Sequence, residues 1–68
     1  MDLTELLIPI FSLSIKCGFE VIIENKPKQN KAELDIPNKK IYINIFDIKD
    51  KKLMDDLNSC LEVLKSID

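Results

Sequence analysis

The clearest alternation in the chain is Lys40-Ile41-Tyr42-Ile43-Asn44-Ile45-Phe46, in which an isoleucine occupies every second position. Successive side chains of a β-strand point to opposite faces, so the isoleucines share one face and the polar or aromatic residues share the other. Isoleucine, tyrosine and phenylalanine also favour strands. Residues 40–46 are therefore predicted to form a strand with one fully apolar face.

Two shorter alternating segments precede this strand, at residues 19–24 and 32–36. The segment between them contains Pro27 among polar neighbours and is expected to be a loop. Pro37 and Asn38 are typical turn residues and separate the second segment from the third. Three short strands with short connections predict an antiparallel meander, in which 19–24 pairs with 32–36 and 32–36 pairs with 40–46.

A helix is predicted on each side of the strands. Asp2 and Glu5 have the spacing of a capping box, and Gly18 is a typical helix stop. Pro9 falls on the polar side of this first helix, although a helix that begins near Ile8 is an alternative. Asp47 or Asp50 should cap the second helix, whose apolar stripe is Leu53, Leu57, Cys60, Leu61, Leu64 and Ile67.

The expected fold is therefore α+β, in the order αβββα, as one domain spanning residues 1–68 with both helices on one face of the sheet. The sheet residues expected beneath the helices are Phe19, Val21, Ile23, Leu34, Ile36, Ile41, Ile43 and Ile45.

Composition excludes many functions. The chain has 68 residues, one glycine and no histidine, so His-based catalytic triads, His metal sites and glycine-rich phosphate loops are absent. Its ten basic residues are all lysines, and twelve acidic residues give a net charge of −2. Without arginine or a basic excess, nucleic-acid binding is disfavoured. We expect a protein that is not an enzyme and needs no cofactor or metal.

Two cysteines and the amino-terminal segment bear on the compartment. Cys17 and Cys60 could form a disulfide between the helices, but reduced, buried thiols are the favoured interpretation. The apolar run 6–15 is about half the length that spans a bilayer, and Asp2 and Glu5 precede it instead of basic residues. A cytoplasmic location is expected.

Two candidate binding surfaces follow from the patterning. The first is the sheet face turned away from the helices, where exposed aromatic residues and carboxylates would bind a basic protein surface: Glu20, Ile22, Glu24, Glu33, Asp35, Tyr42, Asn44 and Phe46. The second is the flank of the first helix that continues past its core face through Ile8, Phe11 and Ile15. This flank, or the edge of the strand at residues 40–46, could also support a homodimer.

Two resemblances concern element order. The αβββα order and length are similar to those of double-stranded-RNA-binding domains, and Asp50-Lys51-Lys52 places two lysines where such domains carry a basic helix start. The strand at 40–44 followed by a helix resembles the first part of ImmA/IrrE-type metallopeptidases. In that helix Glu62 is present, but both zinc-binding histidines of the family motif are missing.

The sequence therefore predicts a small acidic protein that acts by protein–protein binding. An inhibitor or regulator from a low-GC bacterium, phage or mobile element fits its size and its richness in Ile, Lys and Asn, for example an anti-CRISPR-like anti-defence protein or an antitoxin. The alternatives are a nucleic-acid-binding αβββα module and a catalytically dead peptidase-like remnant.

Overall fold

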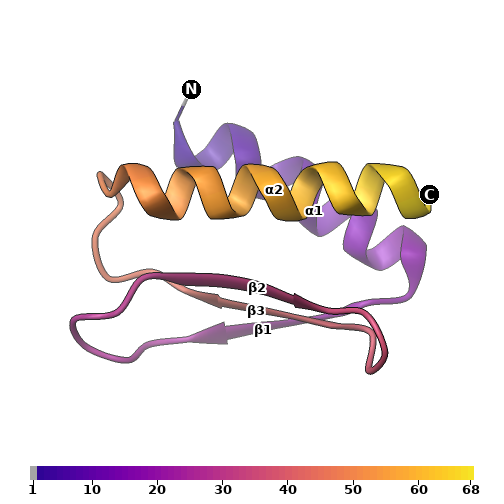
Figure 1. The fold of residues 1–68 in the computed structure, drawn as a ribbon, viewed down its shortest axis with the longest axis horizontal. Coiled ribbons are helices and arrows are strands. Elements are labelled where there is room, and N and C mark those ends of the chain that lie inside the picture. The colour runs from indigo at the N-terminus through magenta and orange to yellow at the C-terminus, as the bar shows by residue number, and fades with distance from the viewer. Residues whose placement is uncertain (1) are drawn as a thin grey trace.

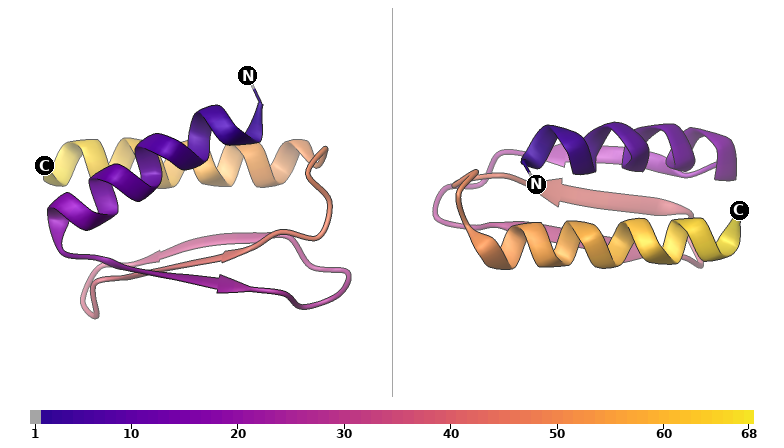
Figure 2. Two further views of the ribbon diagram at one scale, coloured as in Figure 1. Left: turned by 180° about the vertical axis from the view of Figure 1, so that it is seen from behind. Right: turned by 90° about the horizontal axis from the view of Figure 1, so that it is seen from above.

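The computed structural model describes residues 2–68, in which two helices lie on the same side of a three-stranded sheet (Figure 1). The elements follow the order α1, β1, β2, β3, α2, so the predicted α+β class and element order are confirmed. Their bounds are Leu3–Cys17 for α1, Glu20–Glu24 for β1, Lys31–Asp35 for β2, Lys40–Asn44 for β3 and Lys51–Ile67 for α2. Viewed from above, α1 lies over β1 and α2 over β2, with β3 between them (Figure 2).

Both helices begin and end where local chemistry favours it. The Asp2 carboxylate accepts a hydrogen bond from the Glu5 amide at 2.9 Å, which satisfies a free donor of the first turn of α1. Gly18 ends the helix with φ +80°, a left-handed conformation that glycine adopts without a Cβ penalty. Pro9 lies inside α1, so the alternative start near Ile8 is wrong. At α2, the Asp50 carboxylate accepts from the Lys52 amide at 2.9 Å.

The strand order corrects the predicted meander. The sheet runs β1-β3-β2, with β1 parallel to β3 and β2 antiparallel to β3. The β2–β3 hairpin is as predicted, but residues 19–24 pair with 40–44 and not with 32–36. β3 takes the centre, where Ile41 and Ile43 are fully buried and have neighbours on both sides. The free edge predicted for this strand as a homodimer contact is therefore wrong, because both edges of β3 are paired.

This order makes the connection between β1 and β2 cross the carboxyl end of β3 (Figure 1). Residues 25–30 form that crossing loop. Within it, Lys28 follows Pro27 with φ +58°, a backbone conformation that non-glycine residues rarely adopt. The loop therefore contains a defined turn and is not an extended linker.

The core lies between the helices and the sheet. Its buried apolar residues come from α1, β3 and α2 and from Phe19, which directly precedes β1: Leu6, Ile10, Phe19, Ile41, Ile43, Leu53, Leu57, Cys60, Leu61 and Leu64. Val21, Leu34 and Ile45 are half-buried against this core, as part of the predicted set. Two predicted core residues, Ile23 and Ile36, are exposed. Ile36 lies beyond the end of β2, in the hairpin turn, and Ile23 is the next-to-last residue of β1. The carboxyl end of β1 lies beneath the part of α1 that is farther from the sheet (Figure 2).

Candidate functional site

The sheet face turned away from the helices is the first candidate surface. The register aligns its outward side chains in rows, with Tyr42 of β3 between Ile22 of β1 and Glu33 of β2. Seven of the eight predicted residues share this face: Glu20, Ile22, Glu24, Glu33, Asp35, Tyr42 and Asn44. Phe46 does not belong to it as a strand residue, because β3 ends at Asn44 and the chain bends there toward α2.

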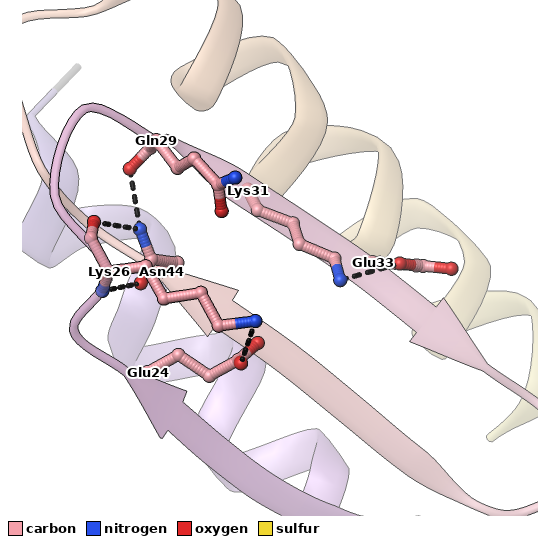
Figure 3. A network of polar contacts seen from close by, with 6 residues as sticks. All are labelled: Glu24, Lys26, Gln29, Lys31, Glu33 and Asn44. Atoms are coloured by element: carbon pink, nitrogen blue, oxygen red, sulfur yellow. Dashed lines mark hydrogen bonds and ion pairs between the residues drawn. The ribbon is translucent and has the colours of Figure 1, made fainter.

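Lysines interrupt the acidity expected of this face. Lys31 lies on it with its Nζ 3.1 Å from the Glu33 carboxylate and 5.5 Å from the centre of the Tyr42 ring. The hydrogen bond that Lys31 donates to the Glu33 carboxylate raises the pKa of Lys31. Lys26 of the crossing loop lies 3.1 Å from Glu24 (Figure 3). Carboxylates that already have lysine partners exert less attraction on a basic protein.

Asn44 holds the crossing loop and is unavailable to a partner. Its Oδ1 accepts from the Lys26 amide at 2.6 Å, and its Nδ2 donates to the carbonyls of Lys26 and Gln29 (Figure 3). The side chain is fully buried. The prediction that it lies exposed on the outer face is therefore wrong, because the loop that the strand order requires covers it.

The second candidate surface is the outer flank of α1. Leu6 lies on the α2 side, where it lines a shallow depression with Met54 and Asn58. Successive residues of a right-handed helix are rotated by 100° about its axis, so the side chains of Leu6, Ile10 and Ser14 point in directions that turn progressively away from α2. All three are buried. Further rotation in the same sense, away from α2, reaches Phe11, Ile15 and Ile8. These three side chains therefore point over the free edge of β1.

Exposure confirms that this flank is uncovered. The exposed fractions are 61% for Ile8 and 78% for Ile15, while Phe11 is half-buried against the core. Ile23, on the helix-facing side of β1, is 60% exposed. We call the group formed by Ile8, Phe11, Ile15 and Ile23 with the unpaired edge of β1 the β1-edge surface. Sequence reasoning assigned Ile23 to the core, because it alternates with Phe19 and Val21 and the helices were expected to cover that whole face of the sheet.

The opposite edge of the sheet has a different character. β2 carries Lys31, Glu33 and Asp35 on its outer face. By helical rotation, Lys52 and Asp56 of α2 lie on the β2 side of the core-facing stripe of that helix. Charged side chains of this kind discourage pairing with another strand. Exposed apolar side chains near the β2 edge, Val63 of α2 and Ile36 beyond the end of the strand, are set among these charges. At the β1 edge, Ile8, Ile15 and Ile23 are more exposed and lie together.

The remaining titratable and thiol side chains are spread over the structure. Groups of three or more metal-ligating side chains are absent from this range. The depression beside Leu6 has a volume of about 470 Å³, opens to solvent and brings together Lys49, Lys51 and Asp55. Cys60 is buried, Cys17 is half-buried, and both are free thiols. Neither helix has the length and apolarity needed to cross a membrane.

Comparison with protein-family models, with curated proteins and with solved structures finds no match to this chain. Any functional assignment must therefore come from the surface itself.

Proposed function

We propose that this protein acts by binding another protein, and that the β1-edge surface makes the contact. The supporting observation is the grouping of three widely exposed isoleucines, from two elements, around one unpaired strand edge. Exposed apolar side chains that gather in one patch, unlike those scattered singly, mark interaction sites. An inhibitory or regulatory role in the cytoplasm, exercised by occupying a partner's surface, suits a small domain with no catalytic arrangement.

The outer sheet face supports this role less well. Asn44 is buried, Tyr42 is half-buried, and Glu24 and Glu33 already have lysine partners. A partner that bound this face would have to displace these contacts and would bury little apolar surface in return. The β1-edge surface requires no such displacement, because its isoleucines face solvent.

Two matched double variants test the proposal. Ile8→Asp with Ile15→Asp removes the helix part of the β1-edge surface. Ile48→Asp with Ile67→Asp alters two exposed isoleucines elsewhere. Each variant and the wild type would be immobilised, and proteins retained from a lysate of the natural host would be quantified by mass spectrometry.

We expect a protein that binds the wild type and the Ile48/Ile67 variant at equal level and is lost from the Ile8/Ile15 variant. All three should keep the same melting temperature, since these side chains lie outside the core. Equal retention by both double variants would place the interface elsewhere. Salt-sensitive binding of duplex RNA or DNA by the wild type would instead favour the nucleic-acid alternative.

A further inference from the structure

The backbone of β1 has hydrogen-bonding groups that no strand uses. In residues 2–68, β1 pairs with β3 alone. The Glu20 amide donates to the Lys39 carbonyl at 2.9 Å, so the backbone groups of Glu20 face β3. Backbone direction alternates along a strand, so Ile22 also faces β3, whereas the N–H and C=O groups of Val21 and Ile23 point out of the sheet.

The side chains beside this edge alternate in chemistry. Val21 and Ile23 lie on the helix side, next to the exposed flank of α1. Glu20 and Glu24 lie on the opposite side, with Ile22 between them. A strand added here would extend the same two faces, so its side chains would meet apolar residues on one face and carboxylates on the other.

We propose that β1 receives an extended segment of the partner as a fourth strand, with basic, apolar, neutral, apolar and basic residues in succession. This inference rests on the proposed function. Its apolar residues pack beside Val21 and Ile23 under the α1 flank. One basic residue pairs with Glu20, and the other pairs with Glu24 in exchange for the exposed Lys26 side chain. Because the pattern reads the same in both directions, it fits a parallel or an antiparallel strand.

A second copy of this chain fits the edge poorly. Antiparallel pairing of two β1 strands about Ile22 sets Glu20 of each copy opposite Glu24 of the other. Like charges directly opposite one another destabilise a strand pair. The charges at this edge therefore favour a basic segment over self-association.

The test uses the full chain and a capped peptide with the core Lys-Val-Thr-Val-Lys. Amide hydrogen exchange and NMR titration would follow β1 residue by residue. Without peptide, the Val21 and Ile23 amides should exchange rapidly and the Ile22 amide slowly. With saturating peptide, we expect Val21 and Ile23 to become at least ~10-fold more protected, because they gain strand partners.

Charge exchange tests the chemistry of the segment. A peptide with the core Glu-Val-Thr-Val-Glu should bind about tenfold more weakly, as expected for the loss of two exposed ion pairs. Glu20→Lys with Glu24→Lys should reverse this preference, and neither substitution touches the core. A peptide methylated at the backbone nitrogens that face β1 should fail to bind.

The outcomes separate this inference from the proposed function. If the host protein is lost with the Ile8/Ile15 variant while Val21 and Ile23 stay unprotected in the complex, the surface is correct and strand addition is wrong. Absence of peptide binding, or equal binding of the Lys and Glu peptides, would also overturn strand addition by a basic segment. Protection of Val21 and Ile23 in a dimer of the protein alone would show that a second copy occupies the edge.

Discussion

Asn44 at the end of β3 and Lys26 in the crossing loop exchange two hydrogen bonds. The side chain of Asn44 accepts from the Lys26 amide at 2.6 Å and donates to the Lys26 carbonyl at 3.1 Å. A third bond, from the same Nδ2, reaches the Gln29 carbonyl. The buried Asn44 side chain thus satisfies three backbone groups of the loop that connects β1 to β2, and these hydrogen bonds stabilise the strand order β1-β3-β2.

Asn44→Ala should therefore destabilise the fold by about 2–4 kcal/mol, because it leaves three backbone groups of the loop without partners. Asn44→Asp should be comparably harmful, since it puts a carboxylate oxygen against the two carbonyls. Urea unfolding measures both changes. Asn25→Ala, at an exposed position in the same loop, is the control and should cost little. A loss below about 0.5 kcal/mol for Asn44→Ala would show that water replaces these bonds.

Asn44 also shows what could not be predicted from the sequence. Alternation correctly placed Asn44 on the face opposite Ile41 and Ile43. Its burial depends on the crossing loop, and the loop crosses only because β3 lies between β1 and β2. Local patterning determines which face a side chain joins, but it contains no information about which strand becomes the neighbour. Strand order arises from packing of the whole sheet.

The predictions for Ile23 and Phe46 were wrong for related reasons. Ile23 alternates with Val21 as a core residue should, yet it is exposed, because α1 is tilted and its amino-terminal part lies farther from the end of β1 (Figure 2). Phe46 continues the pattern of Tyr42 and Asn44, yet the strand ends at Asn44. There Asn30 accepts hydrogen bonds from the Phe46 and Asp47 amides at 2.8 and 2.9 Å and turns the chain toward α2. Neither helix tilt nor a side-chain contact across sixteen residues is visible in local alternation.

By contrast, the elements set by short-range chemistry were predictable. The Asp2 and Gly18 ends of α1, the Asp50 cap of α2 and the hairpin at Pro37 each depend on residues within a few positions. The exposed flank of Ile8, Phe11 and Ile15 was predictable as well, because helical rotation alone separates it from the core face. Its position over an unpaired strand edge required the structure.

Stability should fall at low pH partly through Asp50. The hydrogen bond from Asn30 at 2.8 Å, and next the one from the Lys52 amide, lower the pKa of Asp50 below its usual value of 3.8. Since the folded state binds this proton less readily than the unfolded state, the stabilisation is complete above pH 3.8 and is lost as pH falls through the lower folded pKa.

Asp50→Asn keeps a capping side chain but removes this titration. Urea unfolding from pH 6 to pH ~2 should show the wild type more stable than Asp50→Asn at pH 6, with the difference shrinking toward the acid end. Asp55→Asn, at an exposed position on the same helix, controls for the loss of one negative charge. A difference between wild type and Asp50→Asn that stays constant with pH would contradict the linkage.

The two thiols should differ in reactivity. Burial raises the pKa of the Cys60 thiol, so little thiolate is present at neutral pH. Cys17 is half-buried at the end of α1 and is more accessible. Alkylation followed by mass spectrometry should therefore modify Cys17 at least ~10-fold faster than Cys60 in the folded protein, with both reacting rapidly in urea. Equal native rates would show that the Cys60 region opens readily, and an absence of thiol in urea would show a disulfide.

Ser14 should be a weak point of α1. Its side chain is fully buried, and among the described residues its hydroxyl has no hydrogen-bond partner. A buried hydroxyl without a partner costs roughly 1–3 kcal/mol. Ser14→Ala removes that group without creating a large cavity and also replaces serine by the best helix former. We expect the variant to gain about 1 kcal/mol or more in unfolding free energy, measured in urea. The control is Ser12→Ala, on the exposed side of the same helix. It reports the gain in helix propensity alone, about 0.5 kcal/mol. The additional stability of Ser14→Ala over Ser12→Ala therefore measures the contribution of the buried hydroxyl. If Ser14→Ala is instead the less stable of the two variants, the hydroxyl makes a bond in solution, and the Ile10 carbonyl one turn earlier is its natural acceptor.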